Sequence, residues 1–254
     1  MKYLNAGKST HVIINDLHKP FEDQQAVSVA EKLIQHIQPD YLHYNGDIVD
    51  FYQISKFDKK PWKIADMQSD LDNVAAMFKY HASIFNKTKL YFHVGNHEDR
   101  LRRYLWSVAK ELSQLRCLEL PELLGLKDYG IEMLDYDEGA LINDCFLVMH
   151  GDLVRKNSGY TARAMMEKHG GCGICGHTHR GGSHYQRDRF GEWGWWENFC
   201  LCDLSPDYVQ NPNWQQGITV VQFTTNRFFV EQIPIIDGKC LYGGKIFEAD
   251  KESK

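Results

Sequence analysis

Residues 41–50 of this 254-residue chain read YLHYNGDIVD, a short apolar run that turns polar at a glycine. The run Tyr41–Tyr44 predicts a buried strand, and the turn that follows carries two carboxylates, Asp47 and Asp50. Glycine suits this turn, because a backbone that leaves a strand sharply needs a residue without Cβ. A strand that ends in a polar glycine turn is therefore the unit from which the fold can be worked out.

The same unit recurs along the chain, and a polar cluster follows each of five predicted strands. They are Asp16-x-His18 after 11–15, Gly46-Asp47-x-x-Asp50 after 41–44, Gly95-Asn96-His97-Glu98 after 89–94, His150-Gly151-Asp152 after 141–149, and Gly176-His177-Thr178-His179 after 172–175. Ligands of an open α/β sheet collect at the carboxyl ends of its strands, so we expect these clusters to converge on one cleft. Carboxylates, imidazoles and an amide are suitable ligands for a borderline-hard divalent metal.

Apolar stripes of helical spacing separate several of these strands. They predict helices over 22–38, 66–86, 99–116 and 159–169, the last with Ser158 as its N-cap. Beyond about residue 184 the pattern is β-rich, with strands expected at 217–223 and 228–236. Strands that alternate with helices and give way to a β-rich tail indicate a layered α/β or α+β domain.

The composition is that of an ordinary globular protein, with 43% hydrophobic and 25% charged residues. A net charge of −5 gives no reason to expect a nucleic-acid coat or a membrane-surface protein. No apolar run approaches the roughly 18–20 residues of a membrane span, and the first residues lack the apolar core of a secretory signal. Seven cysteines, an odd number, fit reduced thiols, so we expect a cytoplasmic protein with one domain over residues 1–254.

Two common hydrolase mechanisms lack their motifs here. None of the motif turns offers a serine on a nucleophile elbow, and the phosphate-binding pattern G-x-x-x-x-G-K-[ST] is absent. Metal-assisted chemistry is the remaining interpretation of the five clusters.

In this order the clusters resemble the signature of the calcineurin-like metallophosphoesterases, D-x-H, G-D-x-x-D, G-N-H-[ED], a lone H and G-H-x-H, across residues 16–179. The resemblance implies a four-layer αββα sandwich of two mixed β-sheets flanked by helices, with the last 70 residues completing the second sheet. Residues 155–179 further resemble stand-alone family members of bacteria and their phages, which implies the host cytoplasm if the protein is viral.

The family resemblance also implies two divalent metal ions bridged by Asp47. The ligands it assigns are Asp16, His18 and His179 for one ion, and Asn96, His150 and His177 for the other. Mixed nitrogen and oxygen ligation favours Mn²⁺, with Fe, Zn²⁺ or Ni²⁺ as further transition metals. Two such ions hold a bridging hydroxide in line with the leaving group.

Further roles follow from the resemblance residue by residue. His97 takes the role of general acid, while Asp50 and Glu98 orient imidazoles or the turns themselves. Phosphoprotein phosphatases of the family have a phosphate-gripping arginine where this chain has Phe51, and Arg100 is a candidate to replace it. The departure at Phe51 disfavours a phosphoprotein substrate.

We therefore expect metal-dependent hydrolysis of a phosphate ester, most readily a phosphodiester or nucleotide, with no membrane involved. A DNA or RNA nuclease of the same family is the alternative, and a catalytically inactive binding scaffold is a third hypothesis.

Three groups of residues outside the motifs have two interpretations each. Basic residues after the motif turns form a cationic rim or ordinary solvated faces: Lys19, Lys56, Lys59, Lys60, Lys63, Arg100, Arg102, Arg103, Arg155, Lys156 and Arg180. Cys172-x-x-Cys175 with Cys200-x-Cys202 is a zinc site or, more simply, core packing. Trp193, Trp195, Trp196 and Trp214 stack a nucleobase or cover a sheet face, and seven histidines outside the motifs, among them His11, His43 and His93, are structural or solvated.

Overall fold

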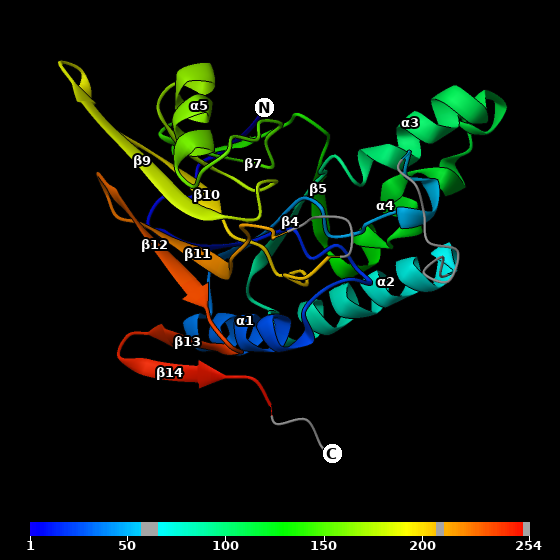
Figure 1. The fold of residues 1–254 in the computed structure, drawn as a ribbon, viewed down its shortest axis with the longest axis horizontal. Helices are drawn as coiled ribbons and strands as arrows, with labels where there is room; N and C mark the ends of the chain where they lie inside the picture. Colours follow the sequence, from blue (N-terminus) through cyan, green and yellow to red (C-terminus); the bar gives the residue numbers. More distant parts are fainter. Residues whose placement is uncertain (57–65, 207–210, 251–254) are drawn as a thin grey trace.

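Two six-stranded mixed sheets form the centre of the molecule in the computed structural model, which describes residues 1–56, 66–206 and 211–250 (Figure 1). The first sheet has the order β12-β11-β2-β3-β4-β5, with β2 Ser9–Ile14, β3 Tyr41–Asn45, β4 Lys89–His93, β5 Ile131–Leu134, β11 Gln216–Phe223 and β12 Phe228–Ile235. The second sheet has the order β1-β6-β7-β8-β10-β9, with β1 Lys2–Leu4, β6 Ala140–Ile142, β7 Phe146–Met149, β8 Cys172–Cys175, β9 Gly181–Asp188 and β10 Gly191–Asn198.

Alternate side chains of β2 point into two different hydrophobic cores, which shows how the layers are arranged. Val12 and Ile14 belong to the apolar core shared with helices α1 (Gln24–Ile37) and α2 (Met67–Ile84). Ile13 belongs to a second core between the two sheets, where Phe146 of β7 is also fully buried. Successive side chains of a strand point to opposite faces, so one strand contributes to both cores.

Helix α5 (Tyr160–His169) covers the outer face of the second sheet. Met165 and Met166 pack there with Leu147 and the fully buried Trp195. Helices, two sheets and a further helix therefore form the four layers expected of the αββα sandwich (Figure 1). None of the helices in the described parts of the chain combines the length and apolar character needed to span a membrane.

Three histidines lie in series in the layer between the sheets. Nδ1 of His11 lies 3.0 Å from Nε2 of His43, and Nδ1 of His43 lies 3.0 Å from Nε2 of His93. Ser9 Oγ contacts Nε2 of His11 at 3.0 Å at one end, while Nδ1 of His93 has no hydrogen-bond partner at the other. We call His11, His43 and His93 the histidine row; all three are at most 1% exposed, so they are structural rather than solvated.

Two predicted elements are divided in the structure. The helix expected over 99–116 ends at Val108 as α3 (Asp99–Val108), and short 3₁₀ turns replace its second half because the leucines there, such as Leu112, face solvent. The strand expected over 141–149 is the hairpin β6–β7. Its turn residues Asn143 and Asp144 have φ of 48° and 55°, the left-handed conformation that a tight hairpin turn requires.

The N-cap predicted at Ser158 is wrong. Gly159 occupies that position with φ of 82° and no side-chain cap. The buried carboxylate of Glu197 on β10 accepts the hydrogen bonds instead, from the backbone N–H of Thr161 at 3.1 Å and of Ala162 at 3.2 Å. A side chain from another element thus replaces the local cap.

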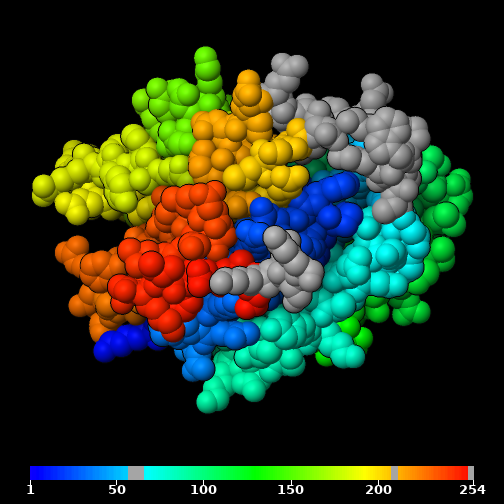
Figure 2. All heavy atoms as spheres, turned by 60° about the horizontal axis from the view of Figure 1, so that its bottom comes forward, coloured from blue at the N-terminus to red at the C-terminus, as the bar shows by residue number. Residues whose placement is uncertain are grey.

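The C-terminal region does not simply complete one sheet, as the resemblance implied. Strands β9 and β10 extend the second sheet, whereas β11 and β12 extend the first. Strands β13 (Lys239–Tyr242) and β14 (Lys245–Glu248) form a separate hairpin that packs Cys240 and Phe247 into the α1 core. Figure 2 shows this hairpin (red) on the surface beside β12 (orange). The remaining short elements are α4 (Leu120–Leu123) and the 3₁₀ turns η1 (Tyr52–Ile54), η3 (Lys110–Leu112), η4 (Arg116–Leu118) and η5 (Leu126–Tyr129).

Candidate metal centre

The five motif turns lie together because their strands end at one edge of the two sheets. Backbone hydrogen bonds join neighbouring turns, from Asp16 N to Gly46 O at 3.0 Å and from Gly176 N to His150 O at 2.9 Å. The Asn45 side chain connects the sheets by donating to Met149 O at 2.9 Å. The strands of both sheets therefore deliver their polar turns to the same place.

Several of the motif side chains are held by unusual backbone conformations. Asp16, His18, Asp47, His177 and His179 all have positive φ, between 51° and 70°. Non-glycine residues rarely adopt this region, and when they do they cluster at functional sites. The surrounding turns are also tight, because a Cβ on Gly95 would collide with the Asp47 carboxylate.

Asp16, His18 and His179 form the first donor group. Asp16 Oδ1 lies 3.7 Å from His18 Nε2 and 3.3 Å from His179 Nε2, and the two ring nitrogens are 3.0 Å apart. The other carboxylate oxygen of Asp16 accepts from Asn15 Nδ2 and from His177 N, which fixes the plane of the carboxylate. Oδ1 is fully buried and has no hydrogen-bond partner.

Asp47, His150, His177 and Asn96 form the second donor group. Asp47 Oδ2 lies 3.3 Å from His150 Nε2, which in turn is 3.2 Å from Asn96 Oδ1. Ligand atoms of Asp47, His150 and His177 all lie within 4.8 Å of one another. Asp47 Oδ2 is also 3.9 Å from His18 Nε2 of the first group. Asp47 therefore lies between the two groups.

These residues fit a pair of divalent transition metal ions. The buried Asp16 Oδ1 lacks a partner, and an unpartnered buried carboxylate oxygen costs free energy that a cation would recover. Carboxylate oxygens, an amide oxygen and imidazole nitrogens are the mixed donor set of transition metals rather than of Ca²⁺ or Mg²⁺.

Electrostatics in the two groups follow from close packing of acids and imidazoles. Burial by itself would raise the pKa of Asp47, but His150 and His97 outweigh it and hold that pKa well below its usual range. Burial likewise opposes the charged form of His179, yet Asp16 raises the pKa of His179 to about 9. The carboxylates are therefore ionised and available as ligands.

Asp50 and Asn45 orient imidazoles of the two groups. Asp50 Oδ2 lies 3.0 Å from His18 Nδ1, and Asn45 O lies 2.8 Å from His150 Nδ1. A partner on Nδ1 fixes the ring and leaves Nε2 free to face the donor group, as is usual for metal-binding histidines.

Glu98 joins two of the motif turns. Its buried carboxylate accepts four backbone N–H groups, from Asp47 at 3.0 Å, Ile48 at 2.7 Å, Val49 at 2.9 Å and Gly95 at 2.8 Å. One side chain thus holds the turn of Asp47 against the turn that carries Asn96.

His97 and Arg100 lie at the rim of the second group. Arg100 Nη2 donates to His97 Nε2 at 2.8 Å, which requires the ring hydrogen to be on Nδ1, next to Asp50. His97 Nε2 is 3.7 Å from Asp47 Oδ2. Arg100 Nη1 also donates to Asp50 O at 2.8 Å, so Arg100 belongs to the site and not to a solvated helix face.

The other basic residues of the predicted rim have mostly different roles. Lys19 pairs with Glu22 at 2.6 Å, and both Arg102 and Arg103 pair with the buried Asp99. Lys59, Lys60 and Lys63 lie outside the described residues, while Lys56 and Lys156 are exposed. Arg180 donates to Arg155 O.

The four-cysteine zinc site, the less favoured of the two interpretations of these cysteines, is not assembled. Among the described residues, the groups of nearby metal-binding side chains exclude Cys172 and Cys175 of β8. Trp195 and Trp196 are buried in the cores, whereas Trp214 lies edge-on to His179 with ring centres 4.2 Å apart. Trp214 therefore makes a ring contact with a residue of the first donor group.

Motif reasoning missed several residues that support the donor groups. Asn15 binds Asp16, and Asn198 of β10 holds Asn15 through its amide while accepting from Thr219 at 2.6 Å. Glu197 Oε2 accepts from Thr178, the residue between His177 and His179, at 2.9 Å. The available signal was polarity, since Glu197 and Asn198 are polar residues within an apolar, tryptophan-rich strand.

Comparison with known proteins agrees with the family that the five motif clusters resemble. The family model for calcineurin-like phosphoesterases matches residues 10–198, well over half of the chain. The Gene 54 proteins of Mycobacterium phages D29 and L5 are each 24% identical over 251 residues, which cover 93% of this chain and 98% of the phage protein. The structure of Vacuolar Protein Sorting 29 from Cryptosporidium parvum has a TM-score of 0.50 and 13% identity, covers 95% of this chain and 99% of that chain, and shares the fold.

Proposed function

The chain belongs to the calcineurin-like phosphoesterases, and on that premise we propose that it hydrolyses a phosphodiester or nucleotide with two divalent cations, Mn²⁺ before Fe, Zn²⁺ or Ni²⁺. The position of Asp47 between two buried donor groups is the observation that carries this proposal. Asp16, His18 and His179 would hold one cation, Asn96, His150 and His177 would hold the other, and Asp47 would contribute to both. Two such cations polarise a phosphoryl oxygen and lower the pKa of water to supply the nucleophile.

His97 protonates the leaving oxygen in this proposal. Its Nε2 lies 3.7 Å from Asp47 Oδ2, so it would lie beside a phosphate bound between the two donor groups. Burial lowers the pKa of His97, and Asp50, which accepts from Nδ1, acts in the opposite direction by favouring the doubly protonated ring. General-acid assistance of this kind contributes about 10²–10⁴ in rate.

We assign two positions to Arg100 in the catalytic cycle, one of which is the position in the structure. In the structure it donates to His97 Nε2, the atom that must carry the transferred proton. A bound phosphate attracts the guanidinium as a bidentate partner, which removes Arg100 from Nε2 and leaves that nitrogen free to accept a proton. In this way Arg100 couples binding of the substrate to protonation of His97 at Nε2.

A diester or nucleotide is favoured over a phosphoprotein by Phe51. This residue is 2% exposed and occupies the place where phosphoprotein phosphatases of the family present arginine to the substrate. Phage relatives at 24% identity support action in a host cytoplasm. A nuclease that acts on DNA or RNA is the alternative within the same family.

A substrate panel with added Mn²⁺ tests the proposal. Bis-p-nitrophenyl phosphate and 2′,3′-cyclic nucleotides should be hydrolysed faster than p-nitrophenyl phosphate and a phosphopeptide. Turnover of labelled DNA or RNA above the diesters would favour the nuclease. Absence of turnover on every member, in protein that contains metal, would leave the inactive scaffold.

A further inference from the structure

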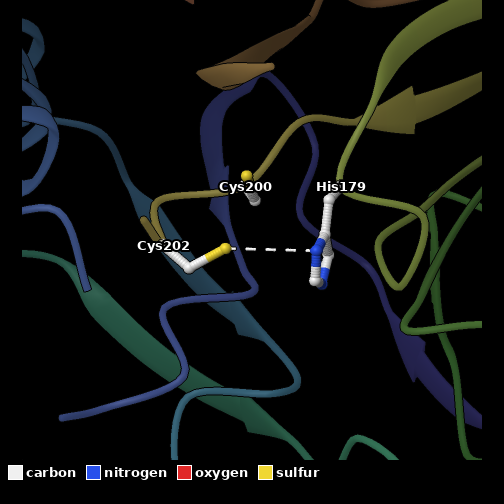
Figure 3. A group of neighbouring side chains, drawn as sticks. All are labelled: His179, Cys200 and Cys202. Atoms are coloured by element: carbon white, nitrogen blue, oxygen red, sulfur yellow. Dashed lines mark hydrogen bonds between the residues drawn. The ribbon is translucent and has the colours of Figure 1, made fainter. Parts of the chain in front are cut away.

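Two thiols lie on the opposite side of the His179 ring from the catalytic donors. Nε2 of His179 faces Asp16 and His18, while Nδ1 lies 4.0 Å from Sγ of Cys202 (Figure 3). Sγ of Cys200 completes this cluster, in which all three ligand atoms lie within 4.8 Å of one another. The same imidazole therefore has a set of donors on each of its two nitrogens.

The backbone holds both thiols in place. Cys200 and Cys202 are two residues apart in an extended segment, which places their side chains on the same side. The segment is fixed by hydrogen bonds from Cys200 N to Gln215 O at 3.0 Å and from Leu201 N to Asp16 O at 3.1 Å. Cys200 is fully buried and Cys202 is 3% exposed, so neither thiol faces solvent.

From this geometry we propose that His179 Nδ1 and the thiols of Cys200 and Cys202 form a third cation site, selective for a thiophilic divalent ion such as Zn²⁺ or Cd²⁺. Two sulfurs and one imidazole are the donors that such ions prefer, whereas the oxygen-rich groups around Asp47 suit Mn²⁺. Donors around a tetrahedral zinc ion lie roughly 3.5–3.8 Å apart, given Zn–S and Zn–N distances of about 2.3 and 2.1 Å. The cluster therefore needs only small adjustments, and binding releases the two thiol protons.

An ion bound at this third site would change how His179 contributes to the first donor group. This consequence rests on the proposed function. A neutral imidazole has one nitrogen lone pair, and the other nitrogen carries hydrogen. An ion on Nδ1 places that hydrogen on Nε2, so His179 no longer binds a cation beside Asp16. The thiophilic site is thus inhibitory, and the thiols make the enzyme sensitive to soft metal ions.

Cadmium titration tests the site without any reference to activity. The wild-type protein, supplied with Mn²⁺, is titrated with Cd²⁺ while the ultraviolet sulfur-to-cadmium charge-transfer band is recorded. We expect the band to saturate near one equivalent, to fall about fivefold or more in Cys202→Ser and Cys200→Ser, and to persist in Cys117→Ser, which alters an exposed cysteine. A wild-type protein without the band, or a band that survives in the double variant, would overturn the proposal.

X-ray absorption on the wild-type protein provides a measurement that does not depend on folding of the variants. Two sulfur scatterers per bound cadmium are expected, and an oxygen-only shell would refute the site. A role of Cys202 limited to hydrogen bonding with His179 would produce neither the band nor the sulfur shell.

Inhibition is measured separately, as each protein's activity with one equivalent of Cd²⁺ relative to its own cadmium-free rate. The wild-type rate should fall about tenfold and that of the double cysteine variant less than about twofold, because only the wild type loses His179. Equal inhibition of both would refute the inhibitory role. A protein without activity before cadmium is added would count against the proposed function and leave the binding result standing.

Discussion

Mild acid should destabilise this protein through His11, the first residue of the histidine row. Burial lowers the pKa of His11 to about 3, whereas an exposed histidine titrates at 6.5. Below pH 6.5 the unfolded chain binds a proton that the folded chain does not, so acidification favours unfolding until the pH reaches the folded value. The stabilising contribution of the neutral ring is therefore fully present only above pH 6.5.

The size of the effect follows from the shift. One histidine of this kind removes about 1.4 kcal/mol of unfolding free energy per pH unit, or roughly 2 kcal/mol between about pH 6.5 and 5. His43 and His93 add to it, because burial, then the neighbouring imidazole of the row, holds the pKa of each well below its usual range; His150 also lowers that of His93. A typical domain has only about 5–15 kcal/mol of stability, so a loss of this size is a large fraction of the total.

The variant His11→Gln isolates the contribution of one member of the row. Its amide can still contact Ser9 and His43 but does not titrate. Urea unfolding of both proteins across this pH range, with EDTA to remove metal linkage, should give a slope about 1.4 kcal/mol per pH unit shallower in the variant. His36→Gln, at an exposed position, is the matched control and should leave the slope unchanged.

The result that refutes this reasoning is an equal slope for wild type and His11→Gln. It would mean that the folded protein accepts a proton on His11. The histidines whose pKa is raised by carboxylates, such as His150 and His179 at about 9, do not interfere, because they titrate above pH 6.5.

Four further changes test the metal centre. Asp47→Asn is expected to lower the content of both metal ions together, and elemental analysis that finds a single ion lost would contradict the bridging role. His97→Ala should slow hydrolysis of 2′,3′-cyclic nucleotides about 10²–10⁴-fold with unchanged metal content, and bis-p-nitrophenyl phosphate less, since nitrophenolate leaves without a proton. Glu98→Gln should cost about 2–6 kcal/mol in urea unfolding, because its amide nitrogen meets two backbone N–H groups; a change within about 0.5 kcal/mol would contradict this. Chelation by EDTA should lower the thermal midpoint by an amount corresponding to about 2.7 kcal/mol for each ion present at a hundredfold excess over its dissociation constant, and an unchanged midpoint would argue against binding to the folded state.

The motif turns could be located from the sequence because the signal is local. An apolar run followed by glycine and acidic or imidazole residues marks the end of a strand, as at Gly46-Asp47 and Gly176-His177, and these turns do lie together. The sequence also contains a local signal for the turn that divides residues 141–149, since Asn143-Asp144 is typical of a hairpin turn. Apolar residues on both sides of this turn outweigh that signal and favour one continuous strand.

Long-range partners could not be predicted in the same way. The cap of α5 is Glu197, which lies 36 residues after the Thr161 N–H that it accepts. The thiol of Cys202 meets His179 only because the segment after β10 runs beside the loop after β8. Such contacts depend on how elements far apart in the sequence are placed in the fold, and no local pattern of residues encodes them.

Each donor group takes its side chains from both sheets, so an ion bound there would cross-link the two sheets of the sandwich. Asp16 follows β2 and His179 follows β8, while Asp47 follows β3 and His150 follows β7. Shearing one sheet over the other would have to break coordination bonds as well as slide apolar side chains past each other. A pulling experiment should therefore find the loaded protein mechanically stiffer along this direction, and limited proteolysis should cut the metal-free form first.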